Sequence, residues 1–160
     1  MREIKMGEKE IRVRAVAPAL FYYKQEFNAD LTSDLIKIIS STLEIVASAT
    51  GKNVKELTSQ DLTDLKEGKV NPSTLGSYNM DSIALLQIVW AMAKADAYGQ
   101  AFPSFIKWLE DIDPSCIFDP LFLAAALEEA AGGFLRGAKP QQSTKQPGAR
   151  KARPGNYRHR

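Results

Sequence analysis

Between Asp81 and Tyr98 the chain carries apolar side chains around most of the circumference of a helix. They include Ile83, Leu85, Leu86, Val89, Trp90, Ala93 and Ala97. Lys94 and Asp96 are the only charged residues of the stretch after Asp81, and Gly99 follows it. A helix that is apolar on most sides has to be surrounded by other elements, because no side of it is suited to water. We therefore predict that this stretch is the central helix of a small helical bundle.

Four further segments are expected to be helices that pack around the central one. A proline in the first turn or a Ser, Thr or Asp cap begins a helix, and a glycine commonly ends one. These signals, with apolar repeats of three and four residues, predict helices from Pro18 to near Asn28, from a Thr32 or Ser33 cap to Gly51, from Phe102 to Ile112 and from Asp119 to Phe134. The apolar pattern of residues 52–77 is less regular. It predicts a short helix, with Ser59 capping its second half, followed by a loop at 71–76.

The N-terminal residues 2–16 follow a different period. Ile4 and Met6 alternate with polar residues, and so do Ile11 and Val13. Alternation of this kind is typical of a strand with one buried face. We predict a short β-hairpin with a loop over residues 6–10, packed on the helices because an isolated hairpin is only marginally stable.

The chain divides into an acidic body and a basic tail. Residues 1–135 hold 13 Lys and Arg against 19 Asp and Glu, whereas residues 136–160 hold 8 bases and no acid. Apolar periodicity ends in the tail, so it lacks the surface that would offset its ordering entropy. The fold class predicted is thus mainly α, with one helical domain over 1–135 that includes the hairpin, and a disordered basic tail over 136–160.

Composition argues against catalysis and against a membrane location. His159 is the only histidine and lies in the tail, and Cys116 is the only cysteine. A Cys–His or Ser–His nucleophile and a zinc site are therefore not expected, and the sequence has no phosphate- or dinucleotide-binding glycine motif. No apolar run approaches the ~20 residues needed to span a bilayer. We expect a cytoplasmic protein that is not an enzyme and needs no cofactor or metal.

Two binding alternatives remain open from the residues alone. Asp81-Ser82-Ile83 resembles the attachment site of acyl carrier proteins, whose serine carries phosphopantetheine, although an Asp or Ser there is also an ordinary helix cap. The basic tail, with Arg150, Lys151 and Arg153 close together, would suit contacts to nucleic-acid phosphates. A single aromatic residue in the tail gives little for base stacking, so nucleic acid is not the favoured partner.

The order of segments in the body resembles one known family. The hairpin of residues 4–15 leads into Pro-Ala-Leu-Phe-Tyr-Tyr-Lys-Gln-Glu-Phe at 18–27, followed later by Leu-Leu-Gln-Ile-Val-Trp-Ala-Met-Ala-Lys at 85–94 and Phe-Ile-Lys-Trp-Leu-Glu at 105–110. With a final helix rich in Ala, Leu and Glu, this pattern resembles the tail assembly chaperones of long-tailed bacteriophages and related prophages. The similarity covers roughly residues 2–135.

The resemblance implies a non-enzymatic role in virion assembly. Chaperones of this family coat the long, apolar tape-measure protein in the host cytoplasm and are displaced as the major tail tube protein polymerises around it. The partners expected are therefore the tape-measure protein, the tail tube protein and other copies of the chain. Large aromatic side chains are typical of cores and also anchor interfaces. The candidate anchors are Phe21, Tyr22, Trp90, Phe105, Trp108 and Phe122.

Overall fold

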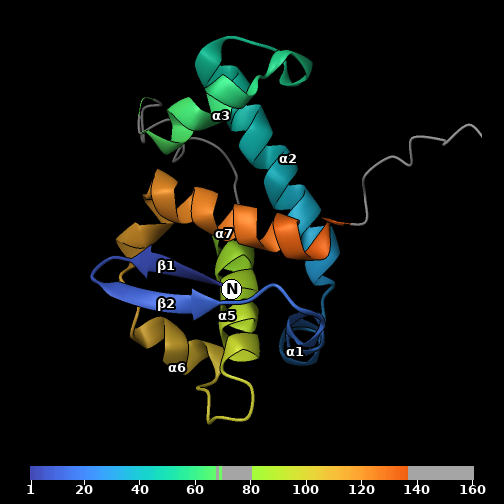
Figure 1. Cartoon of the computed structure of the whole chain (residues 1–160), viewed down its shortest axis with the longest axis vertical. Helices are drawn as coiled ribbons and strands as arrows, with labels where there is room; N and C mark the ends of the chain where they lie inside the picture. Colours follow the sequence, from blue (N-terminus) through green and yellow to red (C-terminus); the bar gives the residue numbers. More distant parts are fainter. Residues whose placement is uncertain (68, 70–80, 137–160) are drawn as a thin grey trace, which may run out of the picture.

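The computed structural model describes residues 1–67, 69 and 81–136, and in this part the chain is mainly helical with one N-terminal hairpin (Figure 1). The predicted fold class is confirmed. The elements are β1 (Arg2–Met6), β2 (Lys9–Val13), α1 (Ala17–Phe27), α2 (Leu31–Thr50), α3 (Ser59–Lys66), α5 (Ser82–Asp96), α6 (Phe105–Glu110) and α7 (Pro120–Phe134), with short 3-10 turns at Val54–Glu56 and Pro114–Phe118.

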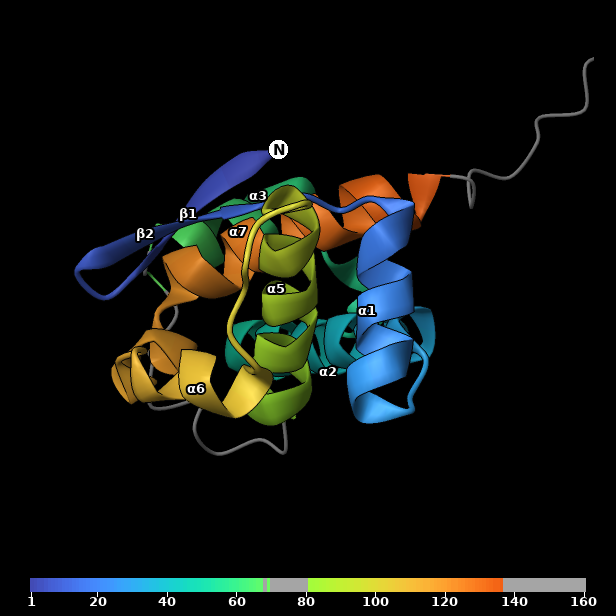
Figure 2. The same ribbon diagram turned by 90° about the horizontal axis from the view of Figure 1, so that it is seen from below.

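Helix α5 is the centre of the molecule, as its sequence predicts. Its side chains are buried almost without interruption from Ala84 to Ala95. It contacts α1, α2, α6, α7 and β2, and Figure 2 shows it between α1 and α6. Because α5 is covered on most sides, one continuous apolar core joins the hairpin to the helices.

The hairpin has a tighter turn than the predicted loop over residues 6–10. The two strands pair from Arg2 opposite Val13 to Met6 opposite Lys9, which leaves only Gly7 and Glu8 in the turn. Gly7 has a φ of 63° and Glu8 does not have a positive φ, which suits a type II′ turn with glycine first. The predicted loop was wrong at its ends because a two-residue turn lets the strands pair through Met6 and Lys9.

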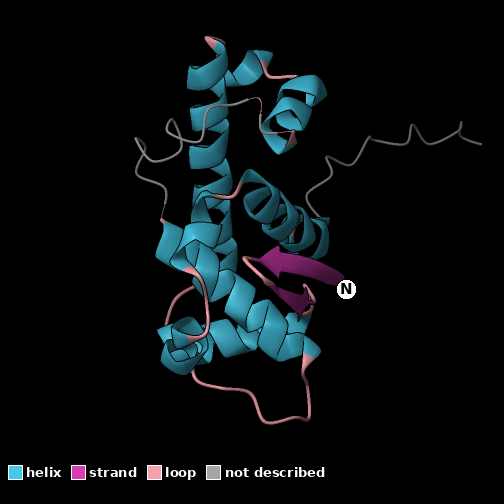
Figure 3. Cartoon of the chain, turned by 90° about the vertical axis from the view of Figure 1, so that its left-hand side faces the viewer, coloured by secondary structure: helices cyan, strands magenta, loops and turns pink. Residues whose placement is uncertain are grey.

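The hairpin lies on one side of the helices (Figure 3), with β2 over α5 and β1 beside α7. Ile4, Met6 and Val13 are buried on its inner face. Asp96, near the end of α5, forms ion pairs with Arg12 at 3.3 Å and with Arg14 at 3.6 Å. These contacts fix the hairpin on α5 and supply the packing that a two-stranded sheet requires.

Several helix ends differ from the sequence prediction. Asp30, and not Thr32 or Ser33, caps α2, since its carboxylate accepts hydrogen bonds from the Ser33 backbone N–H at 3.2 Å and the Ser33 hydroxyl at 2.6 Å. Thr58 takes the capping role expected of Ser59, because its hydroxyl accepts from the backbone N–H of Asp61. The predicted end of α2 at Gly51 is confirmed.

The helix predicted over residues 102–112 is shorter than expected. It spans Phe105–Glu110 and is followed by the 3-10 turn Pro114–Phe118. The loop predicted at 71–76 and the tail beyond Arg136 lie outside the described residues. None of the helices described is long and apolar enough to cross a membrane.

Candidate protein-binding surface

Four of the six predicted anchors lie in the core. Trp90 is fully buried, and Phe105, Trp108 and Phe122 are buried as well. Trp90 donates a hydrogen bond from Nε1 to the carbonyl oxygen of Pro103 at 3.2 Å. Their burial corrects the prediction that these four side chains anchor a partner, because their surfaces are already covered by the chain itself.

Three of these buried rings, those of Trp90, Phe105 and Trp108, form one cluster with Phe27. Phe27 makes edge-to-face contacts with Trp90 and Phe105, at ring-centroid distances of 5.5 and 5.0 Å. Phe105 stacks on Trp108 at 6.2 Å. Aromatic pairs in these arrangements contribute about 0.5–1.5 kcal/mol beyond their buried area. The cluster therefore holds α1, α5 and α6 together.

Phe21 and Tyr22 are the predicted anchors that remain accessible. Phe21 is 64% exposed and Tyr22 is half-buried. The Phe21 ring meets the Tyr22 ring edge to face at 6.0 Å. The Lys94 ammonium lies 4.9 Å from the centre of the Tyr22 ring and 4.6 Å from that of Trp90. A chain of ring and cation contacts thus links the exposed Phe21 to the core residue Trp90.

Phe21 belongs to an apolar face on the outside of α1. Ala17, Leu20 and Phe21 are exposed, and their spacing of three and four residues puts them on one side of the helix. We call these three residues, with Tyr22 at their flank, the α1 face. Exposed apolar residues are normal when they are scattered, so the grouping of Leu20 with Phe21 is what makes this face a candidate binding surface.

Tyr23 holds the α1 face from the inside, and sequence reasoning did not single it out. Its ring is buried, and its hydroxyl donates a hydrogen bond to Asp34 Oδ2 at 2.9 Å. Burial, and then the Asp34 carboxylate, raise the pKa of the Tyr23 hydroxyl far above its ordinary value. The phenol therefore stays protonated and ties α1 to α2. The sequence signal was the spacing of Ala19, Tyr23 and Phe27, which puts them on one helix face.

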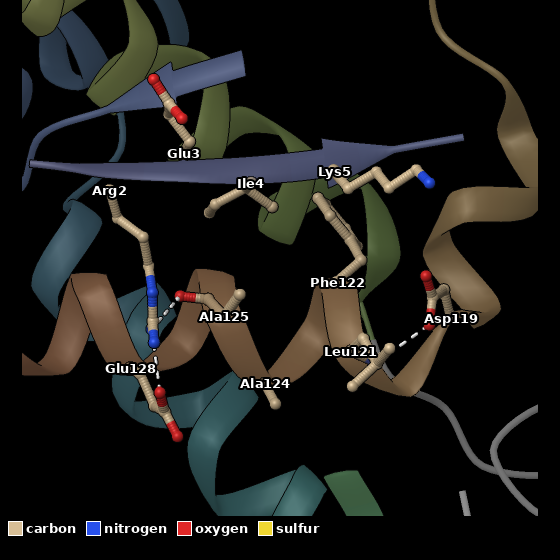
Figure 4. A pocket seen from close by; sticks show the side chains of 10 residues that line it. All are labelled: Arg2, Glu3, Ile4, Lys5, Asp119, Leu121, Phe122, Ala124, Ala125 and Glu128. Carbon is tan, nitrogen blue, oxygen red and sulfur yellow. Dashed lines mark hydrogen bonds and ion pairs between the residues drawn. The ribbon is translucent and has the colours of Figure 1, made fainter. Parts of the chain in front are cut away.

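A second surface feature is a groove of about 340 Å³ between β1 and α7 (Figure 4). Ile4 and Phe122 form its floor, and Leu121, Ala124 and Ala125 belong to its α7 wall. Arg2 crosses one end, donating to the Ala125 carbonyl at 3.2 Å and pairing with Glu128 at 2.8 Å (Figure 4). The groove is thus apolar in the middle and charged at that end.

The other residues considered for chemistry have ordinary structural positions. Asp81 caps α5 by accepting from the backbone N–H of Ala84 at 2.9 Å, which confirms the capping interpretation for Asp81. Ser82 begins α5 and is partly exposed. Cys116 is buried, and its burial raises the pKa of the thiol. Within residues 1–67, 69 and 81–136, no three His, Cys, Asp or Glu side chains are grouped as a metal site would need.

The tail residues Arg150, Lys151 and Arg153 lie outside the described part of the chain. The nucleic-acid and carrier interpretations stay predictions from the sequence. No protein-family model, no curated protein and no solved structure matches the chain.

Proposed function

We propose that this protein is a tail assembly chaperone that binds the tape-measure protein in the host cytoplasm and keeps it soluble until the tail tube protein polymerises. The proposal begins from the order of the hairpin and the aromatic helices in the sequence, which resembles that family. The observation that carries it is the α1 face, where Phe21 is exposed and yet held by contacts that reach the core. The partner surface expected is an apolar helix face of the tape-measure protein.

The packing of the α1 face suits reversible binding. A side chain that is already ordered loses little conformational entropy when it meets a partner, so a small contact gains affinity without a large interface. Phe21 is ordered by Tyr22, and Tyr22 by Lys94. A chaperone that must be displaced during assembly needs many contacts of this modest size, because a large apolar interface would be too slow to release.

The charge of the body supports the same role. Residues 1–135 have six more acids than bases, from 19 Asp and Glu against 13 Lys and Arg. Net charge of one sign keeps a protein soluble and separates its copies. A complex coated with many such bodies gains the same solubility.

The direct test is retention of the tape-measure protein by the immobilised full-length chain. The tape-measure protein is the product of the long coiled-coil reading frame expected beside this gene. Wild-type protein is expected to retain it, and Phe21→Asp is expected to lose at least about 90% of the retention, since a hot-spot side chain contributes about 2 kcal/mol or more. The matched control is Ile106→Asp, because Ile106 is 66% exposed on α6 and lies outside the α1 face.

The possible outcomes distinguish an error in the proposed function from an error in the proposed binding surface. If wild-type protein retains no tape-measure protein, the proposed function is wrong. If wild type, Phe21→Asp and Ile106→Asp all retain it equally, the function stands but the α1 face is not the binding surface. Equal thermal unfolding midpoints of the three proteins exclude misfolding as the cause of any loss.

A further inference from the structure

Strand β1 has one edge that pairs with no other strand in the described part of the chain. Its other edge is occupied by β2. Arg2 and Ile4 point toward α7, whereas Glu3 points to the opposite side of the strand (Figure 4). Helix α7 therefore supports the inner face of β1, and the groove lies along the free edge. Exposed strand edges are sites where another chain can pair.

The turn fixes which backbone groups point out of this edge. A two-residue turn leaves Met6 and Lys9 as a pair that exchanges backbone hydrogen bonds, and alternate pairs along the ladder do the same. Arg2, Ile4 and Met6 thus bond to β2. The backbone N–H and C=O groups of Glu3 and Lys5 point away from β2, toward the free edge.

The sequence of β1 is complementary to itself when two copies run antiparallel. With Ile4 opposite Ile4 of the second copy, Glu3 lies opposite Lys5 and Lys5 opposite Glu3. The residues that face each other with opposite charge are then the same ones whose backbone groups are free to bond. Opposite charges across a strand pair stabilise it.

Only this register places opposite charges across the strand pair and also brings the free backbone groups of the two strands together. A register centred on Glu3 or on Lys5 places like charges opposite each other, which is destabilising. A shift by one residue would put a free backbone group opposite one already bonded to β2, so no ladder forms. The hairpin already uses the same rule, since it pairs Glu3 with Arg12 and Lys5 with Glu10.

The pairing would also produce alternating charge across four strands. One row on the outer face would read Glu10, Lys5, then Glu3 and Arg12 of the second copy, so each neighbour has the opposite sign. Beside this edge, Leu121 on the α7 wall is 62% exposed and adds apolar surface for the second copy to cover. The charges on the outer face and the apolar surface beside the edge therefore both favour a second copy of the chain as the partner.

We infer that two copies of the chain associate through their β1 edges, centred on Ile4, to form a continuous four-stranded antiparallel sheet. This goes beyond the proposed function and does not depend on it. The strand has five residues, so the interface is at the small end of specific protein interfaces and the dimer dissociates readily on dilution. In a complex on the tape-measure protein, such contacts would link neighbouring chaperone molecules.

Sedimentation velocity of the full chain over a wide concentration range, up to several hundred micromolar, tests the inference. Wild-type protein is expected to pass reversibly from monomer to dimer. Glu3→Lys and Lys5→Glu each place two like-charge pairs in the interface and are expected to raise the dimer dissociation constant about tenfold or more. An equimolar mixture of the two variants pairs Lys with Glu at both positions and is expected to regain wild-type association.

The mixture makes the test independent of any effect on the hairpin itself, because each variant chain is unchanged by mixing. Lys107→Glu on α6 changes net charge by the same amount as Lys5→Glu and is expected to leave association unaltered. A monomer at every concentration would overturn the inference and leave the edge free for an extended segment of another protein. So would a dimer that resists both variants, or a mixture that stays monomeric.

Discussion

Gly133, near the end of α7, allows the segment that leaves β2 to cross the helix closely. A Cβ atom placed on Gly133 would lie 2.2 Å from the Cβ of Ala15 and 2.4 Å from its carbonyl oxygen. Contacts that short require the backbone at Ala15 to move. We expect Gly133→Ala to lower the free energy of unfolding by about 1–3 kcal/mol, measured by urea denaturation.

Gly132 is the matched control for this prediction. In the described part of the chain, no atom beyond the adjacent residues and the backbone of its own helix lies within 4 Å of a Cβ placed on Gly132, although it belongs to the same helix. Gly132→Ala is expected to be neutral or to stabilise by up to about 1 kcal/mol, since alanine favours the helix over glycine. Equal effects of the two substitutions would show that the crossing at Ala15 is looser than described.

The burial of single side chains was the property that the sequence predicted least completely. It identified the large aromatics as core residues or anchors, but it did not separate the two groups. Phe21, Tyr22 and Tyr23 are adjacent, yet the first is exposed, the second half-buried and the third buried. That difference depends on how α1 is rotated against α5, which is a tertiary property and is not encoded in local residue type.

At the scale of elements, a buried carboxylate links α3 to the residues that follow α2. Asp61 is buried and accepts from Lys52 Nζ at 2.8 Å, and from the Thr58 N–H and hydroxyl at 2.7 Å each. The Lys52 ammonium, and then the Thr58 donors, lower the pKa of Asp61 to about 2. The ionised carboxylate is therefore favoured by folding.

This arrangement predicts how stability responds to acid. A lowered folded-state pKa gives stability that is present above the unfolded pKa of about 4 and is lost as pH falls toward 2. Asp61→Asn is expected to be less stable than wild type at pH 6, and the difference should close between about pH 4 and pH 2. Denaturation of both proteins across this range gives the measurement.

Asp111→Asn serves as the control, because the Asp111 side chain is 77% exposed and lies 3.9 Å from Lys9. It is expected to have little effect at pH 6, as exposed ion pairs contribute little. A stability difference for Asp61→Asn that stays constant from pH 6 to pH 2 would contradict the account of the α2–α3 corner.

The elements themselves were largely predictable. Central α5, the end of α2 and the hairpin follow from apolar periodicity, Gly51 and alternation, which are local signals. Helix caps were harder, because Asp30 and Ser33 are both good capping residues and only the backbone geometry selects one. The register of the hairpin depended on the turn length, which Gly7 permits but does not fix.

At the scale of the whole molecule, the path from sequence to function has two parts. The fold follows from an apolar α5 that other elements must surround, and this left the α1 face and the β1 edge as surfaces outside the core. The candidate site was predictable only as a set of aromatic residues. The groove and the free β1 edge were not predictable from the sequence, because they arise from the packing of β1 beside α7. Neither segment alone carries a signal for that contact.

The proposed function requires the α1 face to keep a long apolar partner in solution. Its most direct test is the soluble fraction of the tape-measure protein after co-expression with the wild-type chain, with Phe21→Asp or with Ile106→Asp. We expect the tape-measure protein to stay soluble with wild type and Ile106→Asp, and to precipitate both with Phe21→Asp and when it is expressed alone. If the tape-measure protein precipitates to the same extent with wild-type protein as without it, the proposed chaperone function is wrong.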